Sequence, residues 1–192
     1  MTFGLAPPAH CDREWSGRWQ TDLANVLSDT ATQLQQAVVI GLGTVGGKRE
    51  EYTARRAADS LVATAAAVQA TKLIIHSPRP DKPEKDGFPS GHAAMAFCLA
   101  TVLAERHEEL GAWPYVYASG VAWSRIELGR HTVGQVLAGV GLGYMVGNSS
   151  ANGQVYFGQV FVPDHDRFLG MPGFEPSPQA ATPILPLLEI RW

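Results

Sequence analysis

Three short blocks of sequence, KLIIHSPRP (residues 72–80), PSGH (89–92) and SRIELGRHTVGQ (124–135), decide how the rest of the chain is interpreted. Five of their side chains are candidates for one site: the cations Lys72, Arg79 and Arg125 and the histidines His92 and His131. A phosphate ester carries negative charge and gains more on its equatorial oxygens as it reacts, so positioned cations suit it. Any one of these cations could be an ordinary surface charge, but together the blocks predict a phosphate site.

The segments before the second block have the composition of helices. Residues 50–75 contain no Gly or Pro and are dominated by Ala, Leu and Val, which predicts one long helix. Pro78 and Pro80 would stop it. Apolar side chains also recur at helical spacing over residues 12–42, which predicts one or two helices there. Residues 81–87 are expected to form a charged, solvated loop.

Further helices are expected after the second block. One should begin at Ser90 or Gly91 and end at about residue 108. Residues 111–114 would break the chain, and residues 132–145 form a Gly-, Ala-, Val- and Leu-rich segment predicted to be helical. The predicted fold class is therefore all-α, a helical bundle.

A chain of 192 residues with 45% hydrophobic and 17% charged residues is expected to be one ordered domain over residues 1–192. We expect the helical core to cover residues 12–147 and an irregular C-terminal tail to cover residues 148–192. Within the tail, residues 155–162 fit a short strand or a helix. The tail could cover the core or bridge to a second subunit of a homo-oligomer.

The glycine-rich stretch GLGTVGGK (residues 41–48) superficially resembles a phosphate-binding loop. Its lysine is not followed by Ser or Thr, and no strand precedes it. We interpret it as a flexible turn between helices.

The PSGH block adds donors of another kind. The first N–H groups of a helix that begins there are unpaired, and the helix dipole favours an anion beside them. Gly91 would let the backbone approach an oxygen closely, and the Ser90 hydroxyl could donate to the same anion. Alternatively, Ser90 is simply a helix cap.

His92 and His131 could divide the two tasks of phosphoester hydrolysis, which are nucleophilic attack and protonation of the leaving oxygen. Gln135 follows His131 by four residues, so on a helix both lie on one face. The Gln135 amide could accept a hydrogen bond from the imidazole N–H and thereby fix its tautomer.

Together the three blocks resemble the signature of the type 2 phosphatidic acid phosphatase superfamily, which includes bacterial acid phosphatases and vanadium-dependent haloperoxidases. The resemblance covers residues 72–135. The positions that match the first, second and third blocks are Lys72, Arg79 and Pro80, then Pro89 to His92, then Ser124, Arg125 and His131.

The resemblance implies a phosphatase without a metal or cofactor, built as a helical bundle. His131 would attack phosphorus to form a phosphohistidine, and His92 would protonate the leaving group. The residues implied to hold the phosphoryl oxygens are Lys72, Arg79, Ser90, Gly91 and Arg125. The sequence departs from the family at Gln135, where most members have Asp, and a neutral amide stabilises a positive imidazole less than a carboxylate does.

The favoured substrate is a lipid or isoprenoid phosphate, either a monoester or a diphosphate, although the blocks also fit a small phosphorylated molecule. Two alternatives stay open. One is a haloperoxidase-like enzyme that holds vanadate as a phosphate mimic. The other is a non-catalytic protein that binds phosphate or a lipid headgroup, which Gln135 suggests.

The expected partners and location follow from charge and hydropathy. A net charge of −3 gives no indication of nucleic-acid binding. A membrane span needs about 20 mostly apolar residues, and residues 110–124 and 132–147 are shorter and interrupted by Pro or Gly. The first ten residues lack a secretory signal pattern. We therefore expect a soluble, cytoplasmic protein that could contact a membrane peripherally.

Overall fold

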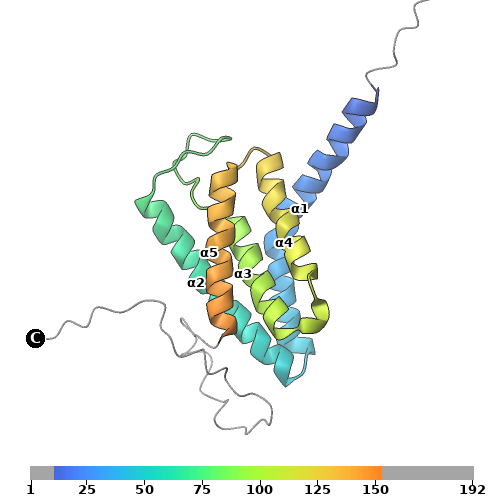
Figure 1. The fold of residues 1–192 in the computed structure, drawn as a ribbon, viewed down its shortest axis with the longest axis vertical. Helices are drawn as coiled ribbons and strands as arrows, with labels where there is room; N and C mark the ends of the chain where they lie inside the picture. The colour runs from blue at the N-terminus through green and yellow to red at the C-terminus, as the bar shows by residue number, and fades with distance from the viewer. Residues whose placement is uncertain (1–10, 153–192) are drawn as a thin grey trace, which may run out of the picture.

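The computed structural model describes residues 11–152 of the chain. The described residues form a helical bundle without strands (Figure 1), which confirms the predicted all-α fold. The elements are α1 (Cys11–Val45), α2 (Lys48–Ile74), α3 (Gly91–Arg106), the 3₁₀ helix η1 (Glu108–Leu110), α4 (Trp113–Glu127) and α5 (Val133–Ala151). Most of the expected C-terminal tail, including residues 155–162, lies outside the described residues.

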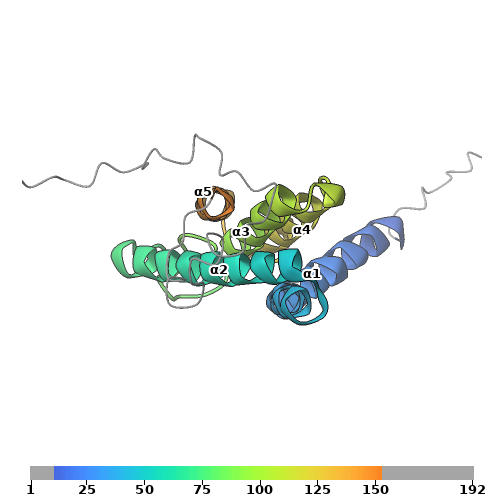
Figure 2. The ribbon, with the colours of Figure 1, turned by 90° about the horizontal axis from the view of Figure 1, so that it is seen from below.

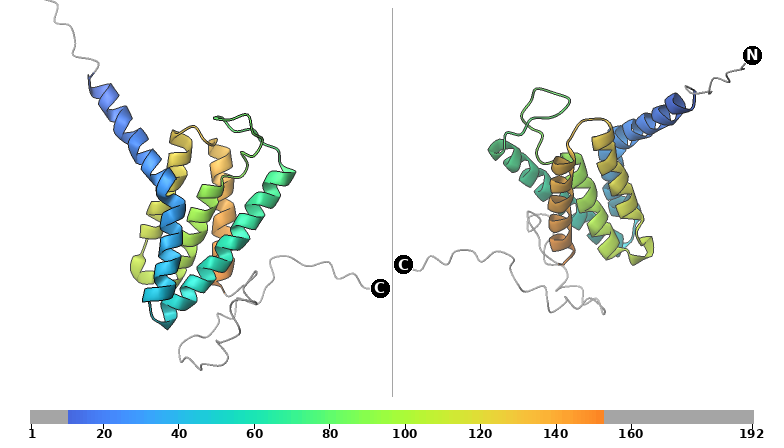
Figure 3. Two further views of the ribbon diagram at one scale, coloured as in Figure 1. Left: turned by 180° about the vertical axis from the view of Figure 1, so that it is seen from behind. Right: turned by 45° about the horizontal axis from the view of Figure 1, so that its top comes forward.

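Helix α3 lies in the middle of the bundle and packs against α2, α4 and α5 (Figures 1 and 2). Helix α1 packs against the bundle from about Ala24 onward, and its N-terminal turns project beyond it (Figure 3). The buried apolar residues are mostly alanines, such as Ala57, Ala93 and Ala118, so the helices can approach closely. None of the helices within residues 11–152 is both long and apolar enough to span a bilayer.

The prediction of a flexible turn at residues 41–48 was wrong for most of that stretch. Helix α1 continues through Val45, and only Gly46 and Gly47 separate it from α2. Contact with α2 explains the difference, because a Cβ added at Gly43 would lie 3.4 Å from the Cβ of Ala54. Packing against a neighbour thus offsets the low helix propensity of glycine.

The predicted break at residues 111–114 is confirmed only in part, and helix α5 is longer than expected. Gly111 and Ala112 form the turn before α4, whereas Pro114 lies in the first turn of α4, where its missing N–H leaves no bond unmade. Helix α5 runs to Ala151, past the expected core boundary at residue 147. Ser150, a poor helix former, is fully buried, and its hydroxyl lies 3.5 Å from the Arg56 carbonyl oxygen of α2.

A stripe of glycines brings the backbones of α3 and α5 into direct contact. Gly139, Gly143 and Gly147 lie one turn apart on α5. Added Cβ atoms there would collide with carbonyl oxygens of Ser90, Ala94 and Cys98 on α3. Since the first turns of both helices lie at the same end of the bundle, the stripe holds those turns together (Figure 1).

The glycine stripe gives a stability prediction. Gly143→Ala is expected to lower the free energy of unfolding by about 1–3 kcal/mol, because its Cβ would overlap the Ala94 carbonyl oxygen and push the helices apart. Gly141, two residues away, has open space around it. Gly141→Ala is therefore the matched control, and it should raise the free energy of unfolding by about 0.5–1 kcal/mol. Urea unfolding followed by circular dichroism measures both, and equal effects would contradict the proposed packing.

Candidate active site

Four helix ends and one loop converge at the upper end of the bundle in Figure 1. Lys72 lies in the last turn of α2, Arg125 in the last turn of α4, and His92 in the first turn of α3. His131 precedes α5, and the loop between α2 and α3 carries Arg79. All the residues that the sequence proposed for the site therefore belong to this end.

The imidazole of His131 is almost fully buried and is held at Nδ1 by two oxygens. Nδ1 lies 2.9 Å from the Gly87 carbonyl oxygen and 3.2 Å from Oε1 of Gln135. The orientation of the Gln135 amide is settled by its other end, because Nε2 lies 2.9 Å from the Pro78 carbonyl oxygen, which can only accept. Nδ1 therefore carries the proton, and the lone pair of Nε2 is available for attack.

The first turn of α5 fixes Gln135 itself. The Thr132 hydroxyl accepts from the Gln135 backbone N–H at 3.3 Å, and Oε1 of Gln135 accepts from the Thr132 N–H at 3.1 Å. This reciprocal cap satisfies two N–H groups at the helix start. The predicted pairing of His131 with Gln135 is thus present, and Gly87 is an acceptor that the sequence did not indicate.

Both imidazoles resist protonation in the site. Burial lowers the pKa of His131 and the charges of Arg125 and Arg79 lower it further, whereas the hydrogen bonds to Gln135 and Gly87 raise it. Burial, followed by the charge of Arg125 and the neighbouring His131, Arg79 and Lys72, lowers the pKa of His92 to about 4. The pKa of His92 thus responds to charged residues from the first and third sequence blocks, which shows that the three blocks converge in the fold.

The cations of the first block share one carboxylate. Asp86 forms a two-point ion pair with Arg79, with Nε–Oδ1 and Nη2–Oδ2 distances of 2.8 and 2.9 Å. Lys72 Nζ lies 3.9 Å from Oδ2 of the same carboxylate. Asp86 falls in residues 81–87, which the sequence pattern indicated to be a solvated loop, so this residue was missed.

Two buried donors at this end have no hydrogen-bond partner among the described residues. Ser90 is fully buried, and its Oγ neither caps α3 nor bonds elsewhere in the described chain. Arg125 is 3% exposed; it donates to Ser28 through Nη1, but its Nε is unpaired. Buried donors are nearly always paired, so the oxygens of a phosphate group suit both, and the reading of Ser90 as a plain cap is disfavoured.

The charge on Arg125 persists despite burial. Burial and the neighbouring Arg130 and Arg79 lower its pKa to about 10, while Asp81 and Asp29 oppose the shift. The guanidinium therefore stays positive at neutral pH. Burial also lowers the pKa of Lys72, and Asp86 opposes that effect.

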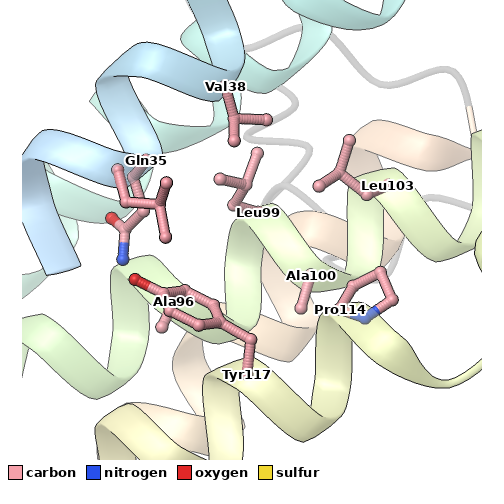
Figure 4. A pocket seen from close by; sticks show the side chains of 9 residues that line it. Gln35, Val38, Ala96, Leu99, Ala100, Leu103, Pro114 and Tyr117 are labelled. Atoms are coloured by element: carbon pink, nitrogen blue, oxygen red, sulfur yellow. The ribbon is translucent and has the colours of Figure 1, made fainter. Parts of the chain in front are cut away.

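Two other features bear on what the site can hold. Within residues 11–152, His, Cys, Asp and Glu side chains form no group of three or more that could bind a metal ion. An apolar cavity of about 150 Å³ lies between α1, α3 and α4 (Figure 4). Its lining, which includes Leu34, Leu99 and Tyr117, contains none of the predicted site residues, so it is separate from the phosphate site.

Comparison with known proteins adds a family and one relative. The profile of the PAP2 superfamily matches residues 54–158. The chain is 30% identical over 138 residues to a lipid A 1-phosphatase of Porphyromonas gingivalis, and the alignment covers 69% of this chain and 31% of that protein. The chain thus spans about a third of the length of this curated relative. No solved structure matches it significantly.

The convergent cations predict anion binding that can be measured without turnover. Inorganic phosphate or vanadate should raise the melting temperature of the wild type, compared with chloride at equal ionic strength. Arg79→Gln should weaken that binding about tenfold or more, because it removes charge-assisted hydrogen bonds to the anion. Arg55→Gln is the control, since Arg55 pairs with Glu51 on the exposed face of α2. Equal phosphate affinity in Arg79→Gln and wild type would contradict the assignment.

Proposed function

Because the chain belongs to the PAP2 superfamily, whose profile matches residues 54–158, we propose that it is a phosphatase that hydrolyses a lipid or isoprenoid phosphate through a phosphohistidine. The observation that carries the proposal is the buried imidazole of His131. Two oxygens accept from its Nδ1, no hydrogen bond engages its Nε2 among the described residues, and the charges of Arg125 and Arg79 act on the ring.

In the mechanism His131 is the nucleophile, and His92 is the group that donates and later accepts a proton. Nε2 of His131 attacks phosphorus in line with the leaving oxygen, and the N–P bond forms as the P–O bond breaks. His92 gives its proton to the departing oxygen. In the second half, a water molecule gives a proton to His92 and attacks phosphorus, so that a P–O bond forms as the N–P bond to His131 breaks. Phosphate leaves, and His131 is again neutral and His92 again protonated.

The remaining residues stabilise charge on the phosphoryl group. Lys72, Arg79 and Arg125 are cations, and the Ser90 hydroxyl and the Gly91 N–H at the start of α3 are neutral donors. Arg79 can exchange its contact with Asp86 for a contact with substrate, since the Asp86 side chain is 45% exposed.

Substrate binding also prepares the general acid. The cations that lower the pKa of His92 are the residues proposed to bind phosphate. A bound phosphate dianion offsets their charge, so it raises the pKa of His92 and favours its protonated form. His92 is therefore charged mainly when a substrate is present.

Exposed apolar residues beside the phosphate site support a substrate with an apolar chain. Leu73 and Ile74 follow Lys72 directly and are 77% and 79% exposed, and Val133 and Leu137 are exposed on the first turns of α5. The similarity to a lipid A 1-phosphatase supports the same substrate class. These residues would also allow peripheral contact with a lipid surface.

The nucleophile assignment gives the most direct test. His131→Ala should lower phosphate release by at least about 10³-fold, as loss of a nucleophile does in other covalent hydrolases. A suitable panel contains an aryl phosphate, phosphatidic acid and a prenyl diphosphate, each with EDTA. His76→Ala is the control, because His76 is exposed on the neighbouring loop and has no assigned task. Turnover that survives in His131→Ala would refute the mechanism, and no turnover by the wild type on any substrate would favour a binding protein.

The lowered pKa values predict an acidic optimum for kcat/KM. Turnover requires neutral His131 and protonated His92, and in the free protein the pKa of His92 is about 4 and that of His131 is also lowered. The value of kcat/KM should therefore fall as the pH rises toward neutrality. The value of kcat should stay high to a higher pH, because bound phosphate raises the pKa of His92.

Arg79→Gln tests what the neighbouring cations, which act in addition to burial, contribute to this pH dependence. Arg79 lowers the pKa of both histidines, so its removal should shift the optimum of kcat/KM to higher pH. Identical pH profiles for kcat and kcat/KM in the wild type would show that bound phosphate does not charge His92.

A further inference from the structure

The loop between α2 and α3 is closed at its base, next to the nucleophile. The Gly87 N–H donates to the Ser77 carbonyl oxygen at 2.7 Å. Farther out, the Arg79 N–H lies 3.4 Å from the Glu84 carbonyl oxygen. Residues 77–87 therefore form a closed loop, and this loop carries both Arg79 and Asp86.

The side chain of Gln135 joins that loop to His131. Its Nε2 donates to the Pro78 carbonyl oxygen at 2.9 Å and to the Ser77 hydroxyl at 3.1 Å. Its Oε1 accepts from Nδ1 of His131 at 3.2 Å. One amide thus uses its donors on the loop and its acceptor on the imidazole.

The Gly87 carbonyl is the nearer of the two acceptors at Nδ1, at 2.9 Å against 3.2 Å. Its position depends on the absence of a side chain. A Cβ at Gly87 would lie 2.6 Å from Nε2 of Gln135 and 2.7 Å from the Pro78 carbonyl oxygen. Any larger residue would push the loop away from the imidazole.

A carboxylate in place of the Gln135 amide would not serve this arrangement. A carboxylate has only acceptors, and the Pro78 carbonyl also only accepts. The loop would then face a charged oxygen where it now has an N–H donor. Gln135 therefore donates a hydrogen bond to this loop that an aspartate or glutamate carboxylate could not donate.

We propose that the carbonyl of Gly87 is the main group that positions the His131 imidazole, and that Gln135 serves chiefly to tether the loop that carries Gly87. This inference rests on the proposed role of His131 as nucleophile. It makes Gly87, Gln135 and Ser77 positioning residues. It also links Arg79 to His131 through the same loop, so that phosphate binding and alignment of the nucleophile depend on one segment.

The first experiment compares Gln135→Glu with the wild type. If Gln135 mainly oriented the imidazole, an acid of the same length would preserve or increase kcat. Under the tether proposal, kcat should fall by about 10- to 100-fold, because displacement of a reacting group by about 1 Å has effects of that size. A kcat at or above the wild-type value would overturn the proposal.

The second experiment compares Gly87→Ala with Gly141→Ala. Gly141 lies on α5 with open space around it, so its substitution should leave activity unchanged. Gly87→Ala should lower kcat about 10- to 100-fold with a smaller change in KM. It should also lower the pKa of His131 further, because the bond from Gly87 raises that pKa in the wild type. An unchanged kcat in folded Gly87→Ala would contradict the proposal.

Nitrogen NMR of the histidine rings supplies a readout that does not depend on turnover. The wild type should show His131 with its proton on Nδ1, and Gly87→Ala should populate the form with the proton on Nε2. Ser77→Ala, which removes one acceptor of the tether, should have a smaller effect in the same direction. An unchanged tautomer in Gly87→Ala refutes the positioning role, whereas activity that survives in His131→Ala refutes the proposed function instead.

Discussion

The direct contact of the α3 and α5 backbones is the constraint on which the rest of the structure depends. Glycines spaced one turn apart allow α5 to rest on the carbonyl oxygens of Ser90, Ala94 and Cys98. The Ser90 N–H then donates to the Gln135 carbonyl oxygen at 2.9 Å, which locks the first turns of the two helices together. As a result His92 and His131, which are far apart in sequence, lie close enough for His131 to lower the pKa of His92. Side chains at the glycine positions would separate them.

The site places several positive charges close together, and the protein compensates only part of their mutual repulsion. Burial lowers the pKa of Lys72 and Arg125, and neighbouring cations lower both values further. Asp86 supplies a counter-charge to Lys72 and Arg79, but it is nearly half exposed. Within residues 11–152, the hydrogen-bond partner of the Arg125 side chain is the neutral Ser28 hydroxyl, and Asp81 and Asp29 offset its pKa shift only in part. Positive charge that the protein leaves uncompensated favours an anionic ligand, because the ligand removes repulsion that is already present in the free protein.

Local patterns in the sequence predicted the parts of the structure that depend on local forces. The absence of Gly and Pro predicted α2, and the PSGH block predicted the start of α3 at Gly91. The helical course of residues 41–45 and the end of α5 at Ala151 were not predicted, because packing against α2 overrides propensity there. Asp86 and Gly87 were missed for a similar reason. Their partners, Arg79 and His131, are set by the closure of a loop and not by any spacing on a helix.

The neutral acceptors at His131 suit a site in which the general acid has a low pKa. In the proposed mechanism the productive free state has neutral His131 and protonated His92. The population of that state falls about tenfold for each unit by which the pKa of His131 exceeds that of His92, since one unit corresponds to about 1.4 kcal/mol. Burial, and then the surrounding cations, lower the pKa of His92 to about 4. A carboxylate at Nδ1 would raise the pKa of His131 and widen the gap, whereas the oxygens of Gly87 and Gln135 orient the ring without a full negative charge. A site so rich in cations therefore favours an amide over an acid at residue 135.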